Sequence, residues 1–483
     1  MNEQQVTVNP PETDDNRPGR AWRWDITATP ALAWTLRKPW PLTGLRLLVL
    51  GLLLLGIGHG LTQPDSKTGL SLLLFWGLFW PLLTVMVTPS FGNLFCAICP
   101  HGFIGRWLSP VGLKRRFPKA LRGGMIGLSI LVFGYWFIHY SMPGQLERST
   151  QVTAWYFLGF SLFALASFYL FYGMAYCKEL CPLGRLLAVY GKLGATRIST
   201  RKADCASCRG FECAKACRYK LSPFLFEKNN NMEQCTLCMD CVQACDSVRV
   251  QLQPPGLSLF QPIKRIGGSS DYWVLLVVLA VAGVAVQMLH GLQHSGLRDS
   301  LPWNLAGAWL NTALGVSPKV FDFGRVLGLG LALIMTLIAA GIGYRRAARL
   351  AGTDYLTARQ GLVYGLAPAV ILGLMPHTLT RFFTNDAHAL ANAFSGLLGG
   401  NLALEPLASR GDPWLFSLSL LAYLGMIWSL TTLWKRSRLL TPHADLGLRL
   451  RVWFWACLPL LLFIAIYLFK AWAFMTYGPA PRH

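Results

Sequence analysis

"QCTLCMDCVQAC", residues 234–245, places four cysteines at the spacing C-x2-C-x2-C-x3-C. That spacing is typical of bacterial proteins that bind two 4Fe-4S clusters. A second motif, "CASCRGFECAKAC" at residues 205–217, precedes it with the spacing C-x2-C-x4-C-x3-C. In such pairs three closely spaced thiolates bind one cluster and the fourth thiolate binds the other. The two motifs therefore predict a ferredoxin-like module with two clusters.

The crossed ligand pattern divides eight cysteines into two sets. The first cluster is assigned to Cys205, Cys208, Cys213 and Cys245. The second cluster is assigned to Cys235, Cys238, Cys241 and Cys217. Both motifs lack the usual proline after the fourth cysteine, and the two extra residues in the first motif leave room for one ligand to exchange. Four-cysteine zinc sites fit the same C-x2-C pairs and stay open as an alternative.

Four further cysteines form two pairs that each end in Cys-Pro. "FCAICPHGF" contains Cys96 and Cys99, and "YCKELCPLG" contains Cys177 and Cys181. Two neighbouring helices would bring these thiols together as the ligands of a third cluster or of another metal site. Two alternatives stay open, because Cys-Pro also shapes helix ends and thiol pairs also bind copper or exchange electrons as dithiols.

Long apolar runs dominate the rest of the chain. With 53% hydrophobic and 14% charged residues, a chain of 483 residues has too little polar surface for a soluble protein. Nine runs are long enough to cross a hydrocarbon core of about 30 Å as helices. They lie near residues 43–62, 69–88, 124–141, 154–176, 272–294, 322–343, 361–379, 413–433 and 452–472. The expected fold is a mainly α, polytopic membrane protein with the ferredoxin-like module inserted between the fourth and fifth helices.

The runs and motifs divide the chain into four segments. Residues 1–42 are expected to form a cytoplasmic tail, and residues 43–176 the first four membrane helices with the first Cys-Pro loop. Residues 177–262 hold the second Cys-Pro motif and the module, and residues 263–483 the last five helices.

The formal charge of +22 is concentrated in alternate loops. Residues 89–123, for example, hold six basic residues and no acidic one. The positive-inside rule then predicts a bacterial cytoplasmic (inner) membrane protein whose N-terminus and module are cytoplasmic and whose C-terminus is periplasmic. Nucleic-acid binding is not expected, because the basic residues follow helix ends and form no separate domain.

Five histidines lie near the opposite, outer ends of the predicted helices. They are His59, His139, His290, His294 and His377. Ordinary headgroup-level residues would explain them. A quinone pocket with Arg381 nearby and a b-type haem bound by His139 with His290 or His377 stay open as alternatives. The choice matters, because electrons that cross about 30 Å of hydrocarbon need an intermediate carrier.

"YCKELCPLGRLLAVYGKL", followed by the two cysteine-rich motifs, resembles the membrane-bound 4Fe-4S ferredoxin family. The family includes the accessory ferredoxin of periplasmic nitrate reductase (NapH), the membrane core of the nitrous oxide reductase regulator (NosR) and the copper-handling assembly factor of cbb-type oxidases (CcoG), a polyferredoxin. The resemblance spans roughly residues 70–255, although "FCAICP" has two residues between its cysteines where the family usually has three. It implies electron transfer between quinol or cytoplasmic carriers and a partner at or beyond the membrane.

The favoured function is therefore an electron relay, as a subunit of a quinol or ferredoxin oxidoreductase. Its partners would be membrane lipid, quinone, and a ferredoxin, a flavodoxin or a periplasmic or membrane reductase. An acidic carrier would dock on basic residues. These are Lys178, Arg185, Lys192, Lys215 and Lys220. Two other functions stay open, a copper-binding and copper-reducing assembly factor and a redox-sensing transporter.

Overall fold

The computed structural model describes residues 24–64, 69–86, 93–142, 145–191, 194–226, 232, 234–254, 269–409 and 411–480. Among these residues, seven helices are long and apolar enough to cross a membrane. They are Pro39–Thr62, Thr150–Leu170, Ser270–His294, Phe323–Ala351, Tyr355–Leu397, Pro413–Leu440 and Leu458–Tyr477. The mainly helical membrane fold is thus confirmed, but the count of nine spans is not, because the second and third predicted runs form shorter apolar helices.

These two shorter helices each contain a π-helical segment. In the first, η2 (Leu73–Phe79) joins α3 (Leu70–Leu72) to α4 (Trp80–Met86). In the second, η5 (Val132–Phe137) joins α7 (Met125–Leu131) to α8 (Ile138–Ser141). Such bulges are frequent at functional sites, and both segments contribute to the cavity described below.

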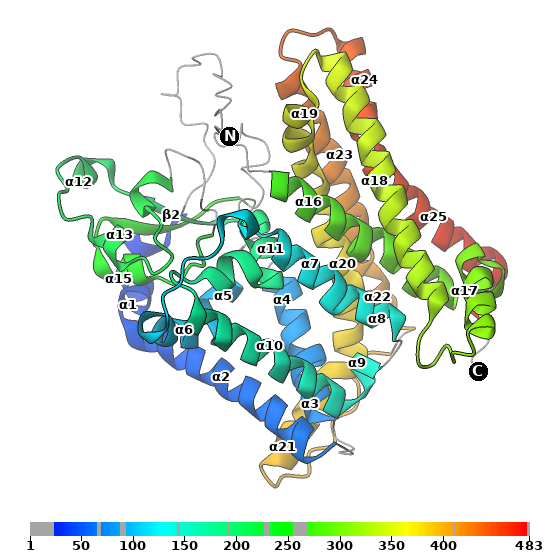
Figure 1. Cartoon of the computed structure of the whole chain (residues 1–483), viewed down its shortest axis with the longest axis horizontal. Coiled ribbons are helices and arrows are strands. Elements are labelled where there is room, and N and C mark those ends of the chain that lie inside the picture. Colours follow the sequence, from blue (N-terminus) through cyan, green and yellow to red (C-terminus); the bar gives the residue numbers. More distant parts are fainter. Residues whose placement is uncertain are drawn as a thin grey trace.

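The described chain has two halves that lie side by side (Figure 1). The first half, residues 24–254, contains α2 (Pro39–Thr62), α10 (Thr150–Leu170) and the ferredoxin-like module with α12 (Lys202–Ala206), α13 (Glu212–Ala216) and α15 (Asp240–Ala244). The second half, residues 269–480, contains the remaining long helices. They are α16 (Ser269–Val278), α18 (Phe323–Ala351), α20 (Ala367–Arg381), α23 (Leu420–Leu440), α24 (Leu446–Ala456) and α25 (Leu458–Tyr477).

The centre of the second half is the continuous helix that α16 begins. Its residues Leu275, Leu276 and Leu279 are fully buried, as expected for a helix that is apolar on every side. At its start, Asp271 forms an ion pair with Arg185 of the first half, with a guanidinium nitrogen 2.6 Å from Oδ1. Both side chains are buried, and the hydroxyl of Tyr364 also donates to Asp271. This buried pair joins the two halves.

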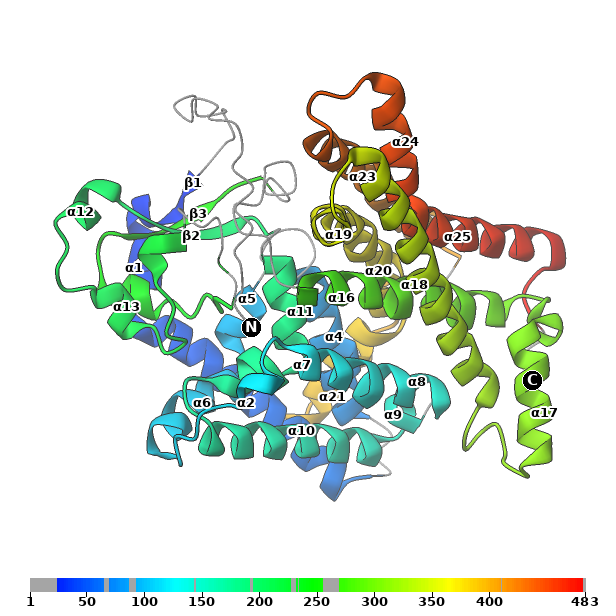
Figure 2. The ribbon, with the colours of Figure 1, turned by 45° about the horizontal axis from the view of Figure 1, so that its top comes forward.

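A small antiparallel sheet supports the module (Figure 2). Its strand order is β1 (Trp24–Asp25), β3 (Val248–Leu252), β2 (Thr196–Thr200), and Ile198 of β2 pairs with Val250 of β3. Within residues 1–42, the segment expected as a tail, the described part from residue 24 onward therefore has regular structure. Its strand β1 covers the free edge of β3, which would otherwise expose unpaired backbone groups.

Candidate iron–sulfur centres

The two Cys-Pro motifs meet in one pocket. Cys96, Cys99, Cys177 and Cys181 all line it, and we call this set the Cys-Pro site. Cys99 lies between α5 (Leu94–Ile98) and α6 (Pro100–Val111), and Cys181 between η6 (Tyr176–Leu180) and α11 (Pro182–Gly191). In both motifs the proline occupies the first helical position, where its missing N–H costs no hydrogen bond. Each cysteine is thereby held at a helix N-terminus.

Backbone N–H groups point at these two sulfur atoms. The N–H of Gly184 donates to Cys181 Sγ over 3.3 Å, and the N–H groups of His101 and Gly102 donate to Cys99. A helix N-terminus and its free N–H groups stabilise negative charge. The site is thus arranged for thiolates, or for an anionic cluster that thiolates hold.

The unligated thiols are strongly biased toward their neutral form. Burial raises the pKa of Cys96 well above its usual value, and the neighbouring Cys99, Cys181 and Cys177 raise it further. Burial likewise raises the pKa of Cys181 to about 12. Because four neighbouring thiolates repel one another, they need positive charge between them, which the iron ions of a 4Fe-4S cluster would carry. The donor set fits a cluster.

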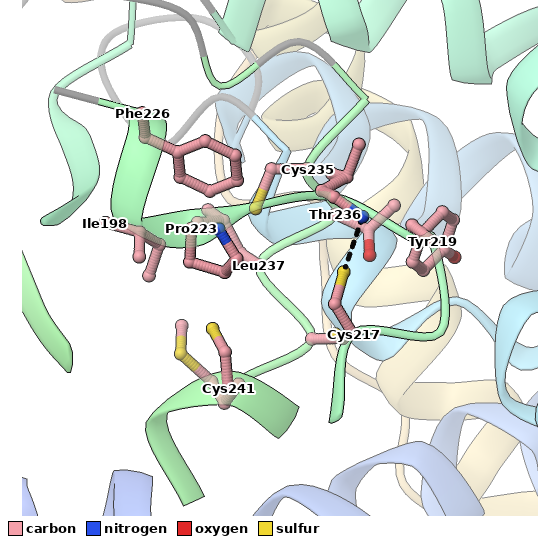
Figure 3. Close-up of a pocket in the computed structure, with 12 residues that line it drawn as sticks. Ile198, Cys217, Tyr219, Pro223, Phe226, Cys235, Thr236, Leu237 and Cys241 are labelled. Carbon is pink, nitrogen blue, oxygen red and sulfur yellow. Dashed lines mark hydrogen bonds between the residues drawn. The ribbon is translucent and has the colours of Figure 1, made fainter. Parts of the chain in front are cut away.

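The second assigned set also meets in one pocket, which we call the inner module site. Cys217, Cys235, Cys238 and Cys241 line it, and Figure 3 shows the sulfur atoms of the labelled Cys217, Cys235 and Cys241 turned toward the same space. The loop wraps around this space through left-handed residues, with φ of 52° at Leu237 and 64° at Met239. The spacing of two residues between successive cysteines permits this wrapping.

The first assigned set, the outer module site, is also brought together. Burial raises the pKa of Cys213, and the nearby Cys245, Cys205 and Cys208 raise it further. Residues next to these cysteines, such as Ala206, Ser207 and Arg209, are exposed, so this site lies close to the solvent. Phe211, one of the residues in the longer spacing, adopts a left-handed conformation with φ of 53° directly before α13.

The three sites follow one another toward the membrane helices. Cys213 of the outer module site contributes to the raised pKa of Cys241 in the inner module site. Cys235 of the inner module site contributes in turn to that of Cys96 in the Cys-Pro site. Tyr219 and Thr236 line both the inner module pocket and the Cys-Pro pocket. They form a thin wall between neighbouring sites.

A buried arginine that the sequence analysis missed ties the last two sites together. Arg46 of α2 donates through Nε to Ala97 O over 2.7 Å and through a terminal nitrogen to Cys238 O over 3.0 Å. Its side chain is 3% exposed. One feature of the sequence could have identified it: Arg46 is a single arginine inside the apolar run 43–62. A charged residue in such a run normally has a partner.

A large apolar cavity begins at the Cys-Pro site, and we call it the membrane cavity. Cys96, Cys99 and Cys181 line one part of it. Its other walls come from α2, η2, η5 and α10, and it encloses about 1470 Å³ when its open mouth is counted. The aromatic walls are closely packed, with ring centroids 3.7 Å apart for Phe75 and Phe157 and 5.7 Å apart for Trp76 and Tyr135. The cavity therefore offers apolar space directly beside the four thiols.

Three of the five predicted histidines meet at the helix ends opposite the module. His139 Nε2 lies 2.9 Å from His290 Nε2, and the His290 and His377 ring centroids are 6.1 Å apart. Glu147 lies 3.1 Å from His139 Nδ1 and 3.3 Å from Arg381.

The two other histidines have different surroundings. His59 lies on α2, and its buried Nδ1 has no hydrogen-bond partner among the residues that the structure describes. His294 is exposed at the end of η11 (Leu292–His294).

The haem prediction does not fit the pair His139 and His290. Two axial nitrogens with metal bonds of roughly 2.0 Å each must lie about 4 Å apart. The observed separation of 2.9 Å leaves no room for iron between them. His290 lies in the π-helical segment η10 (Gln287–Gly291).

The structure removes one residue from the predicted docking surface. Arg185 is buried in its ion pair with Asp271, because its helix packs against the second half of the chain. The ammonium of Lys178 donates to Tyr219 O over 2.6 Å. Lys215 and Lys220 are exposed, and Lys192 lies outside the described residues.

Comparison with known proteins agrees with the cysteine geometry. A family model described as a 4Fe-4S binding domain matches residues 72–118 and 153–201, ranges that contain the four cysteines of the Cys-Pro site. The chain is 24% identical over 247 residues to the putative electron transport protein YccM of Escherichia coli K12. These matches confirm the resemblance to a membrane-associated 4Fe-4S ferredoxin-like family.

The extent of the matches is limited. The YccM alignment covers 45% of this chain and 66% of the relative. The uncharacterized protein MJ0749 of Methanocaldococcus jannaschii is 24% identical over 172 residues, which cover 34% of this chain and 65% of the relative. The chain thus spans slightly less than two thirds of either relative. No solved structure matches it. The family match supports binding of 4Fe-4S clusters by this chain.

Proposed function

We propose that this protein relays single electrons between a soluble carrier at the ferredoxin-like module and a quinone in the membrane. The observation that carries the proposal is the succession of the outer module site, the inner module site, the Cys-Pro site and the membrane cavity. Twelve cysteines supply four ligands to each of three 4Fe-4S clusters. Such a cluster takes up and releases one electron at a time.

The protein's own residues set the conditions for the relay. Helix N-terminal N–H groups at Cys99 and Cys181 stabilise the negative charge of a thiolate-ligated cluster. Arg46 fixes the loop that carries Cys238 against α5, at Ala97 between the first two Cys-Pro ligands. Tyr219 donates its hydroxyl to Cys177 and borders both sites. These contacts keep the two sites at a constant separation.

The membrane cavity suits the ring and tail of a quinone. Ligand sites of this kind are mostly apolar with a few polar groups that orient the ligand. His101, bonded to Ser161 over 2.9 Å, lies at the Cys-Pro end, and Tyr135 and Tyr156 lie further along the wall. A quinone bound there would be in contact with the residues that hold the last cluster.

The soluble carrier would be a ferredoxin or a flavodoxin. Lys215 and Lys220, both exposed near the module cysteines, would attract its acidic surface. The basic end of α18, with Arg345, Arg346 and Arg349, reaches the same side as the Arg185–Asp271 pair, since Tyr344 contacts Tyr272. This distribution supports a module on the cytoplasmic side of a bacterial inner membrane. A periplasmic or membrane reductase would then exchange electrons through the quinone pool.

Metal analysis of anaerobically purified protein tests the proposal. Three clusters require about twelve iron and twelve sulfide ions per chain. Reduction of the clusters by dithionite should then be followed by electron transfer to decylubiquinone. A content of about eight iron ions, with copper bound in addition, would favour the copper-handling function for the Cys-Pro site. Zinc in place of iron would refute the relay.

A further inference from the structure

The far-side histidines form part of a continuous polar chain that starts at the membrane cavity. The ring of Tyr135 lines the cavity, and its hydroxyl donates to Glu147 Oε1 over 3.4 Å. Glu147 lies 3.1 Å from His139 Nδ1. On the other side of the same imidazole, Nε2 lies 2.9 Å from His290 Nε2. His377, the next ring, retains exposed surface. The chain thus leads away from the cavity and away from the module.

The chain is assembled from four separate elements. Tyr135 belongs to η5, His139 to α8, Glu147 to α9 (Gln145–Arg148) and His290 to η10. Two of these elements are π-helical, and a π-helix shifts the direction of the residues that follow it. Polar residues inside a membrane protein are costly unless they pair, and paired ones mark transfer pathways. The polar residues of this chain are paired with one another, as such a pathway requires.

The charge on Glu147 determines which group carries a proton. Burial alone would raise the pKa of Glu147, but the hydrogen bond from His139 and the charges of His139 and Arg381 lower it to about 2. Glu147 is therefore a carboxylate at neutral pH. Its Oε1 lies 3.1 Å from His139 Nδ1, a contact that orients the imidazole. Further charged or titratable groups face the chain from neighbouring elements: Tyr140, Arg325, His377, Arg381, Asp386 and Lys470.

We propose that Tyr135, Glu147, His139 and His290 transfer protons between a quinone in the membrane cavity and the side of the membrane opposite the module. This inference rests on the proposed function. Oxidation of a quinol breaks two O–H bonds, sends two electrons one by one to the Cys-Pro site and releases two protons. Reduction of the quinone takes up the same two electrons and two protons. In either direction electrons and protons would leave or enter the cavity at different ends.

Proteoliposomes that contain a pH-sensitive dye test the inference. Full-length protein is reconstituted with decylubiquinone, and dithionite, which does not cross the bilayer, reduces only molecules whose module faces outward. The wild-type protein should make the lumen alkaline as the quinone is reduced. Glu147→Gln should lose this alkalinisation and reduce the quinone about 10²- to 10⁴-fold more slowly, the range for loss of a positioned proton-transfer group. Vesicles with Cys96→Ser supply the background.

Controls separate proton transfer from folding. Cluster spectra and quenching of tryptophan fluorescence by decylubiquinone should be the same in Glu147→Gln and in the wild type. His294→Gln, an exposed histidine of the same helix end, should behave as wild type. If Glu147→Gln loses its cluster spectrum, His290→Gln tests the chain from another helix and should also abolish lumen alkalinisation.

Two results would overturn the inference. Wild-type protein that reduces the quinone without changing the lumen pH would refute proton transfer to the far side and leave the relay intact. Unchanged alkalinisation in both Glu147→Gln and His290→Gln would exclude the polar chain as the route. Absence of quinone reduction by the wild type would instead remove the proposed function itself.

Discussion

The two halves of this protein differ in how their functional residues are brought together. In the first half, twelve cysteines lie in four short motifs, and these motifs combine in pairs to form three sites. The far-side polar groups come from both halves: His290 of η10 and Arg381 of α20 meet His139 and Glu147 of the first half only through helix packing. Arg185 and Asp271 join the halves. The proposed cluster ligands are thus brought together mainly by short spacings along the chain. The residues of the far-side polar chain meet only when helices from both halves pack together.

The largest effect is expected from removal of one ligand of the Cys-Pro site. Cys96→Ser should lower the iron content from about twelve to about eight ions per chain and abolish quinone reduction, while the module spectra remain. Cys457→Ala provides the control, because this buried cysteine of the second half lies in none of the three sites. Equal iron in the two variants would show that the Cys-Pro site holds no cluster.

The connection between the halves should be the next most sensitive point. Arg185→Met leaves the buried carboxylate of Asp271 without its ion-pair partner, which costs about 3–5 kcal/mol. The double variant Arg185→Met, Asp271→Asn should recover part of this loss, because no lone charge remains. Thermal unfolding in detergent measures the difference. A single variant as stable as the wild type would mean that the pair does not hold the halves together.

A smaller effect should follow from crowding the Cys-Pro site. A Cβ atom on Gly184 would overlap the carbonyl oxygen of Cys177, so Gly184→Ala must displace the backbone that carries two ligands. Such overpacking costs about 1–3 kcal/mol, and the cluster should become more sensitive to oxygen. Gly159→Ala is the matched control, because no atom lies within 4 Å of its added Cβ. Equal cluster lifetimes in air would argue against a strained fit at Gly184.

The smallest effect is expected at the surface of the module. Asp246 pairs with Arg37 over 2.5 Å, but its side chain is 98% exposed. Exposed ion pairs contribute less than about 1 kcal/mol. Asp246→Ala should therefore hardly change the denaturant concentration at which the module releases iron. A loss of stability as large as the one expected for Arg185→Met would show that the N-terminal segment is essential for module stability.

From the sequence alone, the membrane class follows and the three cysteine sets are predicted. Apolar runs of about 20 residues imply membrane helices because backbone groups must be paired inside a bilayer. Closely spaced cysteines imply clusters because neighbouring loop residues reach the same few ångströms of space. The strand Trp24–Asp25 was not predicted, since its pairing with β3 is remote in sequence. Arg185 was misjudged for the same reason, because its partner Asp271 lies 86 residues away.

The surroundings of these sites follow from the tertiary structure and not from the sequence pattern. The membrane cavity, the two carbonyl contacts of Arg46 and the short contact between His139 and His290 all require particular helix packing and π-helical turns. Apolar runs indicate that helices form but not which faces meet, because many faces of a lipid-exposed helix are chemically alike. The sequence therefore predicts the ligands of the proposed relay. The proposed routes of electrons and protons depend on how the helices pack.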